Sequence, residues 1–231
     1  MWSIITVARG MWETTEKFLE SLIKTFDVED YEIIYVDNAS PDRRAWNEFS
    51  KWASQKRLPT KAIRYDTDTS LSKAWNDAID ISYGDTIVIS NNDIEFLDNE
   101  WGKVFEAGLD EQGVGVVGLI GMSWKDTPFI QGGLFAVKLS TLYDLLLDEE
   151  QYFDERFMFT CEDVDFCKRL ANRGYGIKSF EWLLNEGHVV HEFESTRKFY
   201  PERRELIQKW GHLSRVEFCY KWSYPDISIH D

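Results

Sequence analysis

Acidic residues follow two segments that are typical of β-strands and begin one segment that is typical of a helix. Asp37 follows YEIIYV, Asp93 follows TIVIS, and Glu162 and Asp163 open a stretch with helical periodicity. In parallel α/β sheets, ligands collect at the carboxyl ends of the strands, where loops and helix N-termini converge. Carboxylates placed there can hold a divalent cation or take a proton from a reacting hydroxyl. The sequence therefore predicts a site for this chemistry at one edge of a sheet.

The glycine-rich loops that bind phosphate through backbone N–H groups do not occur in the sequence. The first expected strand leads into TVARGMWE, where Gly10 alone stands in place of a G-x-G-x-x-G pattern, and no G-x-x-x-x-G-K-[ST] follows. A cation held by carboxylate and water is then the expected way of binding a diphosphate. Asp93 is the leading candidate for such a cation site.

The composition argues against several other classes of protein. A formal net charge of −15 over 231 residues does not suit binding to a nucleic-acid backbone. Cys161, Cys167 and Cys219 show no CxxC spacing, so neither a disulfide framework nor a zinc ribbon is expected. The apolar run before Arg9 is too short for a signal peptide, and no segment is long enough to be a transmembrane span. We expect a soluble cytoplasmic chain, which can still work at the cytoplasmic face of a membrane.

The elements that must position the acidic residues alternate along the first hundred residues. Apolar and β-branched runs predict strands, and apolar residues at helical spacing predict helices. The strands are expected at 3–7, 31–36, 61–65 and 86–90, and the helices at 12–26, 43–56 and 71–81. Strands separated by helices of this length imply βαβ crossovers and a mostly parallel sheet. Such a layout is typical of nucleotide-binding α/β proteins.

The second part of the chain has a looser pattern. Helices are expected at 99–110, 141–147, 162–172 and 201–210, and strands at 114–119, 134–138, 175–180 and 189–191. The last helix is followed by an aromatic tail, FCYKWSY. The sequence shows neither an internal repeat nor a second domain boundary, and its length suits a single large core.

Several segments, in this order, resemble glycosyltransferase family 2, the inverting nucleotide-sugar enzymes of the GT-A fold. They are SIITVAR, IIYVDNASPD at a V-D-x-x-S-x-D element, SNNDIEF at a D-x-D position, QGGLFAVK and, most specifically, FDERFMFTCEDVDFCKRLANRGYGI. The N-N-D form looks like the rhamnosyltransferase-like branch of that family. The resemblance covers residues 1–195 and is weak beyond them, where only KWG is similar.

The resemblance implies a Rossmann-like α/β domain with a mixed, mostly parallel central sheet. It implies a GT-A domain over residues 1–199, in which residues 1–97 bind the nucleotide and residues 98–199 hold the acceptor and the catalytic group. Residues 200–231 would form a C-terminal helix and tail packed on the same domain.

The resemblance also implies an activity in polysaccharide biosynthesis. A sugar would pass, with inversion, from a nucleotide-diphosphate donor to a hydroxyl of a glycan or glycoconjugate, assisted by Mn²⁺ or Mg²⁺. A UDP-sugar is favoured, and GDP and dTDP stay open. The oligomeric state and the identity of the sugar are not encoded in any pattern of the sequence.

The resemblance implies that particular residues contact the donor. Asp37 matches a carboxylate that accepts a hydrogen bond from the base, although an Asx turn explains it equally well. The other positions expected to contact the donor are Ala8, Asn76, Asn91, Asn92, Gly132 and Gly133. Ser195, Arg197 and Lys198 are expected in a loop that closes over phosphate.

The implied metal ligands are Asp93 and His191. Asp93 matches the D-x-D aspartate, and Asn91 occupies the other acidic position, so a single carboxylate must hold the ion. On a strand, His188 and His191 would point to opposite faces, so only one of them should face the site. The resemblance favours His191. A plain turn is the alternative for the asparagines and Asp93.

The implied catalytic residues are Asp163 and Glu162. Asp163 matches the base that takes the proton of the acceptor hydroxyl, and Glu162 would orient Asp163 or bind the acceptor. A capping box from Thr160 to Asp163 is the structural alternative, since acidic groups are favoured at a helix N-terminus. Two rival functions stay open: a sugar-phosphate nucleotidyltransferase, and a non-catalytic module that binds nucleotide sugars or glycans.

Overall fold

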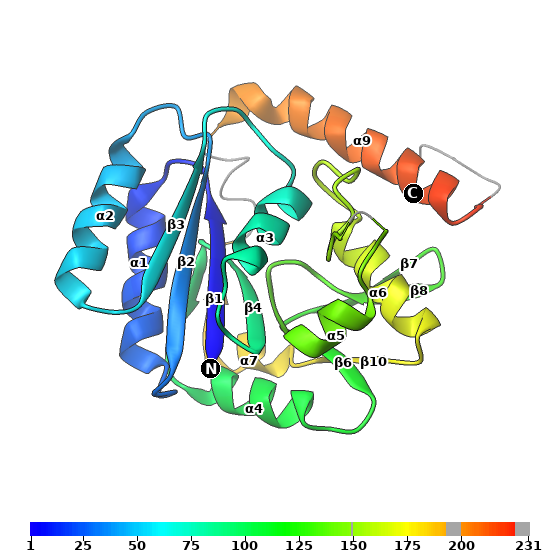
Figure 1. The fold of residues 1–231 in the computed structure, drawn as a ribbon, viewed down its shortest axis with the longest axis horizontal. Coiled ribbons are helices and arrows are strands. Elements are labelled where there is room, and N and C mark those ends of the chain that lie inside the picture. The colour runs from blue at the N-terminus through cyan, green and yellow to red at the C-terminus, as the bar shows by residue number, and fades with distance from the viewer. Residues whose placement is uncertain (149, 193–199, 225–231) are drawn as a thin grey trace.

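A seven-stranded sheet forms the centre of the fold (Figure 1). The computed structural model describes residues 1–148, 150–192 and 200–224. The strands of this sheet are β1 (Trp2–Ala8), β2 (Tyr31–Asn38), β3 (Thr60–Tyr65), β4 (Thr86–Asn91), β6 (Val114–Gly118), β9 (Leu134–Lys138) and β10 (Gly176–Ser179). Their order is β10-β6-β9-β4-β1-β2-β3. Only β9 runs antiparallel to its neighbours β4 and β6, so the predicted mixed, mostly parallel sheet is confirmed.

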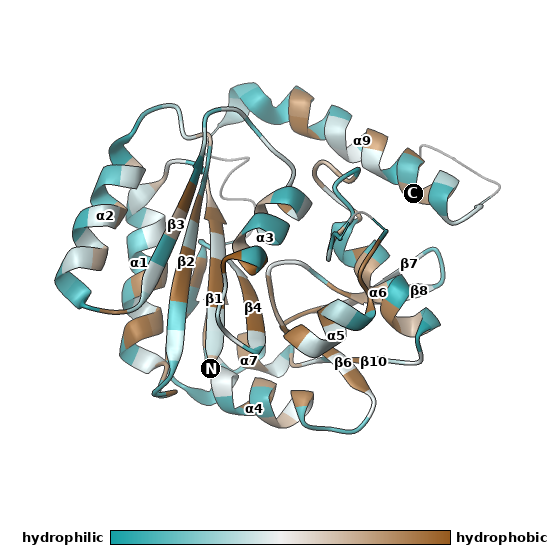
Figure 2. Cartoon of the chain, viewed as in Figure 1, coloured by the Kyte–Doolittle hydropathy of each residue, from teal (hydrophilic) through white to brown (hydrophobic). Residues whose placement is uncertain are grey.

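Helices cover both faces of the sheet, because successive side chains of a buried strand point to opposite sides. On β1, Ile4 packs into the cluster on one face and Ile5 into the cluster on the other. The first cluster is covered by α1 (Trp12–Thr25), α2 (Arg44–Lys56) and α4 (Glu100–Leu109). The second is covered by α3 (Leu71–Asp80), α5 (Leu139–Asp144) and α6 (Glu162–Asn172). Figure 2 shows largely hydrophobic colours on β1 and β4 and bands of hydrophilic and hydrophobic residues along the surrounding helices.

Short elements that the sequence pattern did not predict surround this core. They are β5 (Ile94–Phe96), the hairpin of β7 (Gly121–Trp124) and β8 (Thr127–Ile130), and α7 (Trp182–Asn185). Elements of three or four residues are too short to show a periodicity. The pairing of β5 with β11 (Val189–His191) matters most, because it sets Ile94 opposite His191 and brings two distant chain segments together.

The C-terminal part differs from its prediction. After a 3₁₀ turn, η1 (Pro201–Arg203), a single helix α9 (Arg204–Lys221) includes most of the expected aromatic tail. Its buried positions are Ile207, Gly211, Ser214, Phe218 and Cys219. Two of these residues are small rather than apolar, which conceals the helical periodicity in the sequence.

The C-terminal end of α9 is tied to α6 by charge. Lys221 Nζ lies 2.7 Å from the carboxylates of both Asp154 and Asp165. Trp222 Nε1 donates to Asp165 at 2.9 Å. These contacts hold α9 where Figure 1 shows it, across the edge at which β1 and β4 end. Within the residues that the structure describes, no helix is both long and apolar enough to cross a bilayer.

Substitution of Gly84 should destabilise the fold. Gly84 lies just before β4, and its N–H donates to Ser3 Oγ at 2.8 Å. A Cβ there would lie 2.6 Å from Ser3 N and 2.9 Å from Trp2 C, which are backbone atoms of a central strand. Gly84→Ala should therefore lower the free energy of unfolding by about 1–3 kcal/mol, measured by urea denaturation. Gly176→Ala is the matched control, because its nearest neighbour is Gly113 O at 3.6 Å. Equal losses in both variants would contradict the role of close packing.

Candidate active site

A cavity of about 360 Å³ opens at the carboxyl ends of β1 and β4. The start of α6 and the inner face of α9 close its other sides. Nine of the residues expected at the site line this cavity. They are Ala8, Asn91, Asn92, Asp93, Gly132, Gly133, Glu162, Asp163 and His191. The cavity therefore lies at the strand ends, where the sequence analysis expected a site.

Asp163 is held rigidly at the start of α6. Its Oδ2 accepts a hydrogen bond from Gly132 N at 3.0 Å, and its Oδ1 accepts one from Val164 N at 2.8 Å. A Cβ at Gly132 would lie 3.2 Å from the Trp75 ring and 3.7 Å from Asp163 Oδ2, so the glycine leaves room chiefly for the ring. Burial raises the pKa of Asp163 above its ordinary value, and the two N–H donors oppose that shift. A fixed carboxylate with a raised pKa suits a general base.

The structure contradicts the capping-box alternative for this segment. The residue before the helix is Cys161 rather than Thr160, and no side chain caps the helix start. Cys161 adopts a left-handed conformation, with φ of 71°, that turns the chain into α6. The local contact that Asp163 makes with the first turn of α6 is the hydrogen bond from Val164 N rather than a capping box.

Glu162 is buried beside Asp163, with 6% of its surface exposed. In the described part of the chain, its Oε2 has no hydrogen-bond partner. Burial raises the pKa of Glu162, and the negative charge of Asp163 raises it further. The carboxyl group is consequently favoured in its neutral form near pH 7.

This raised pKa predicts how stability depends on pH. The folded chain binds a proton at Glu162 that the unfolded chain has lost above about pH 4.3, so stability falls as the pH rises above that value. Glu162→Gln removes this loss, and its melting temperature should exceed that of the wild type by a margin that grows from pH 4.5 towards pH 8. Differential scanning calorimetry measures the margin. Glu16→Gln, on the exposed side of α1, controls for the loss of a carboxylate. A margin that shrinks with pH would contradict the burial of a neutral acid.

Asp93 and His191 meet across the β5–β11 pair. Asp93 Oδ1 lies 3.2 Å from His191 Nε2, and Glu192 N donates to Asp93 O at 3.0 Å. Asp93 Oδ1 is buried and, over the described residues, accepts no hydrogen bond of good geometry. One carboxylate oxygen and one imidazole nitrogen suit Mn²⁺. No group of three or more His, Cys, Asp and Glu side chains that could hold a metal ion occurs in the described ranges.

His188 lies away from this pair, as expected. It precedes β11, and its Nδ1 lies 2.7 Å from Asp98 Oδ2. Only His191 of the two lines the cavity. Ser195, Arg197 and Lys198 lie outside the residues that the structure describes.

Asp37 and Asn76, which were expected to contact the donor, are both hydrogen-bonded to other parts of the chain. Asp37 is fully buried at the end of β2, where it accepts hydrogen bonds from Arg64 and from Ser40 N. Asn76 Nδ2 donates to Phe153 O at 2.8 Å, and its Oδ1 accepts from Phe153 N at 2.9 Å. Neither residue lines the cavity.

Cavity residues that sequence reasoning missed include Arg9, Asp68 and Arg203. Asp68 accepts a hydrogen bond from Arg9, and it also accepts one from Arg203 Nη2 at 2.7 Å. Arg9 directly follows β1, so its position at the end of an expected strand could have identified it as a candidate from the sequence. Arg203 comes from the segment before α9, and no local pattern places that segment at the cavity.

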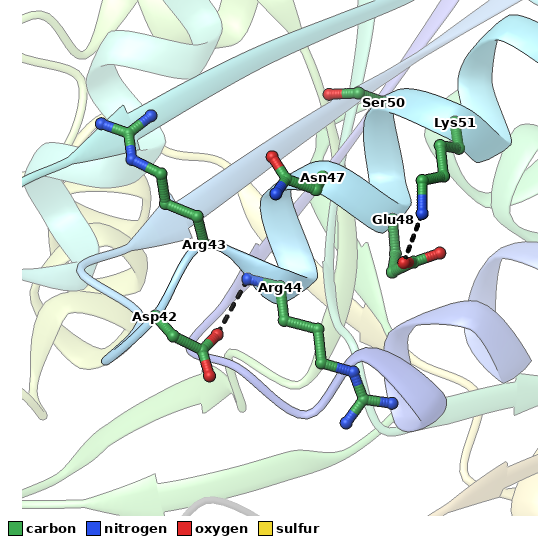
Figure 3. Close-up of a pocket in the computed structure, with 7 residues that line it drawn as sticks. All are labelled: Asp42, Arg43, Arg44, Asn47, Glu48, Ser50 and Lys51. Atoms are coloured by element: carbon green, nitrogen blue, oxygen red, sulfur yellow. Dashed lines mark hydrogen bonds and ion pairs between the residues drawn. The ribbon is translucent and has the colours of Figure 1, made fainter.

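A second hollow lies at the surface of α2 and does not resemble a catalytic site. Figure 3 shows its lining, which comes from α2 and the turn before it. Its polar groups bond to one another, as in Lys51 Nζ to Glu48 at 2.7 Å and Arg44 N to Asp42 at 2.8 Å. Strand ends contribute nothing to this hollow, so it lacks the convergence of elements seen at the cavity.

The fold is an α/β architecture with a cavity at the strand ends, and a family model agrees with it. The model of glycosyl transferase family 2 matches residues 3–167, well over half of the chain. The chain therefore belongs to glycosyl transferase family 2. No curated protein sequence matches it significantly.

Solved structures share the fold at low sequence identity. The mannosyltransferase PcManGT of Pyrobaculum calidifontis, in complex with GDP-Man and Mn²⁺, has a TM-score of 0.65 and 19% identity over 78% of this chain and 54% of its own. TarS 1–349 of S. aureus, in complex with UDP-GlcNAc, has a TM-score of 0.62 and 19% identity over 94% and 66%. GalNAc-T7, with UDP, GalNAc and Mn²⁺, has a TM-score of 0.66 and 14% identity over 97% and 58%. The chain thus spans about half of the mannosyltransferase that it matches.

Proposed function

We propose that the chain transfers one sugar from a nucleotide-diphosphate donor to a hydroxyl of a glycan or glycoconjugate, with inversion and with the help of a divalent cation. One observation carries the proposal: the Asp163 carboxylate and the Asp93–His191 pair line the same cavity. A proton acceptor and a cation site in one cavity are what this transfer requires. The nucleotide-sugar and Mn²⁺ complexes of proteins with the same fold support it.

In this mechanism Asp163 takes the proton of the acceptor hydroxyl. The hydroxyl oxygen forms a bond to the anomeric carbon as the bond to the diphosphate breaks, and the electron pair of that bond stays with the diphosphate. A single displacement inverts the configuration. Asp93 and His191 would hold Mn²⁺ or Mg²⁺, which stabilises the departing diphosphate as a Lewis acid.

In this proposal, three parts of the chain have different roles. Residues 1–97 bind the nucleotide, residues 98–199 hold the acceptor and the base, and residues 200–231 pack on the same domain. UDP is the proposed nucleotide, ahead of GDP and dTDP. We place the reaction in polysaccharide biosynthesis in the cytoplasm, since all three cysteines are buried free thiols.

Thermal shift with UDP, GDP and dTDP, each with and without Mn²⁺, tests this function. A ligand that binds only the folded chain stabilises it, and a hundredfold excess over Kd should raise the melting temperature by about 5 °C or more. We expect the largest rise with UDP and Mn²⁺ together. The absence of a shift with every nucleotide would overturn the proposal. Release of pyrophosphate from a nucleoside triphosphate would instead indicate a nucleotidyltransferase. NMR of the product tests inversion, because it shows the configuration at the anomeric carbon.

A further inference from the structure

Two arginines and one aspartate form a charge cluster in the wall of the cavity. Arg9 Nη1 lies 2.5 Å from Asp68 Oδ1, and Arg203 Nη2 lies 2.7 Å from Asp68 Oδ2. All three side chains line the cavity that also contains Asp93 and Asp163. The cluster has two cationic groups and one anionic group, so its formal charge is positive. An anion that enters the cavity is therefore attracted to this part of the wall.

The two guanidinium groups are held in place by contacts that do not involve Asp68. Arg9 Nη1 also donates to Asn38 O at 3.0 Å. The Arg203 guanidinium lies 5.7 Å from the ring of Trp210, which lines the same cavity. Within the described ranges, Arg9 Nε is buried and has no hydrogen-bond partner. The arginines thus keep donor capacity that the Asp68 carboxylate does not use.

The backbone around Asp68 is likewise fixed by other residues. Asn38 Nδ2 donates to Thr69 O at 3.0 Å, and Thr69 N donates to Asn38 Oδ1 at 3.0 Å. Ser70 Oγ accepts a hydrogen bond from Lys73 N at 3.0 Å and so caps the start of α3. The Asp68 side chain is 27% exposed. Its carboxylate can therefore turn towards water while the loop keeps its path.

A diphosphate suits two guanidinium groups better than a single carboxylate does. It offers more oxygen atoms and more negative charge, and a guanidinium pairs with a phosphate through two parallel hydrogen bonds. Two other cavity carboxylates have different partners, since Asp93 lies against His191 and Asp163 accepts from backbone N–H groups. Asp68 is the carboxylate that an incoming diphosphate would displace from the arginines.

We propose that Asp68 competes with the donor for Arg9 and Arg203, so that the diphosphate binds by displacing the Asp68 carboxylate from the two guanidinium groups. The proposal rests on the proposed function and deepens it, because it makes the affinity for the donor depend on ion pairs within the chain. If Asp68 occupies the arginines for about nine-tenths of the time, the apparent affinity for the anion is about tenfold lower than it would be without this competition.

Asp68→Asn tests the competition, because its effect has the opposite sign to the loss of a binding residue. The variant should bind pyrophosphate in metal-free buffer, and UDP with Mn²⁺, about five- to tenfold more tightly than the wild type. Uridine, which has no phosphate, should bind equally to both proteins. Isothermal titration calorimetry measures the three affinities. Unchanged or weaker binding of pyrophosphate and UDP to Asp68→Asn would overturn the proposal.

Asp66→Asn is the matched control for the loss of one negative charge. Asp66 is exposed two residues before Asp68, and it does not line the cavity. Because water and salt screen an exposed charge, this variant should bind pyrophosphate within about twofold of the wild type. Equal tightening in the two variants would indicate a general effect of net charge and would contradict a specific competition.

Arg203→Gln shows whether the gain depends on the arginines. This variant should bind pyrophosphate about tenfold more weakly, and Asp68→Asn should give a smaller gain in its background, because residues in contact are energetically coupled. Arg204→Gln is the control, since Arg204 is exposed and does not line the cavity. An undiminished gain from Asp68→Asn in the absence of Arg203 would refute the competition.

The outcomes separate this proposal from the proposed function. If the wild type binds UDP and Asp68→Asn binds it no more tightly, the competition is wrong and the proposed function stands. If Asp68→Asn binds pyrophosphate more tightly but neither protein binds UDP, the competition for a diphosphate group stands and the proposed function fails. If neither protein binds either probe, both proposals fail.

Discussion

Asp163→Asn should lower kcat about 10²–10⁴-fold and leave nucleotide binding unchanged, because general-base catalysis contributes a factor of that size. Asparagine can still accept the hydrogen bond from Gly132 N through its amide oxygen, although it loses the one from Val164 N. It has no basic oxygen to take the acceptor proton. Initial rates of UDP release measure the loss, and the thermal shift with UDP and Mn²⁺ measures donor binding.

Asp126→Asn is the matched control for this variant. Asp126 is exposed in the turn between β7 and β8, at a left-handed position that asparagine tolerates. The control removes the same charge and should retain wild-type turnover. Full activity of Asp163→Asn would remove Asp163 from the role of base.

The raised pKa of Asp163 also predicts how kcat/KM depends on pH at the acid end of the pH profile. Asp163 acts only when ionised, and its raised pKa means that the ionised fraction falls at a higher pH than for an exposed aspartate. The wild-type kcat/KM should therefore decline as the pH falls, with a midpoint above about 3.9. A profile that is flat down to pH 4 would contradict this assignment.

Asp93→Ala should lower kcat/KM about 10²-fold or more and abolish the part of the nucleotide thermal shift that depends on Mn²⁺. Asp93 is the carboxylate of the proposed cation site, and its buried Oδ1 has no competing hydrogen bond within the described residues. His191→Ala should have a smaller effect of about tenfold, since an ion bound mainly by oxygen keeps its stronger ligand.

His188→Ala is the control for the histidine. His188 lies three residues before His191 in the chain, but it pairs with Asp98 and does not line the cavity. The His188→Ala variant should keep wild-type activity and the Mn²⁺-dependent part of the nucleotide thermal shift. Equal effects of the two histidine variants, or an Mn²⁺-dependent shift that survives in Asp93→Ala, would contradict the cation site.

The elements that sequence reasoning predicted best are long and strongly periodic. The helix predicted at 162–172 matches α6 residue for residue, and the four strands predicted in the first hundred residues all form. The elements that were not predicted, or whose bounds were wrong, show little hydrophobic periodicity. Strand β5 has three residues, and α9 buries Gly211 and Ser214 where an apolar residue would have marked its inner face.

The sequence by itself determined the α/β class, the position of the site at the strand ends, and the candidates Asp93, His191, Glu162 and Asp163. These features depend on local periodicity and on residue type, both of which can be read along the chain. The order of the strands, including the antiparallel β9, was decided by the tertiary structure.

Only the tertiary structure could show which residues line the cavity. Whether a carboxylate is available depends on its partners in space: Asp37 is bonded to Arg64, whereas Glu162 is left without a hydrogen bond at Oε2 in the part of the chain that is described. Trp210 and Arg203 reach the cavity because α9 packs across the sheet edge. Such contacts join residues far apart in the chain, and burial and charge pairing at these distances follow from packing rather than from local sequence.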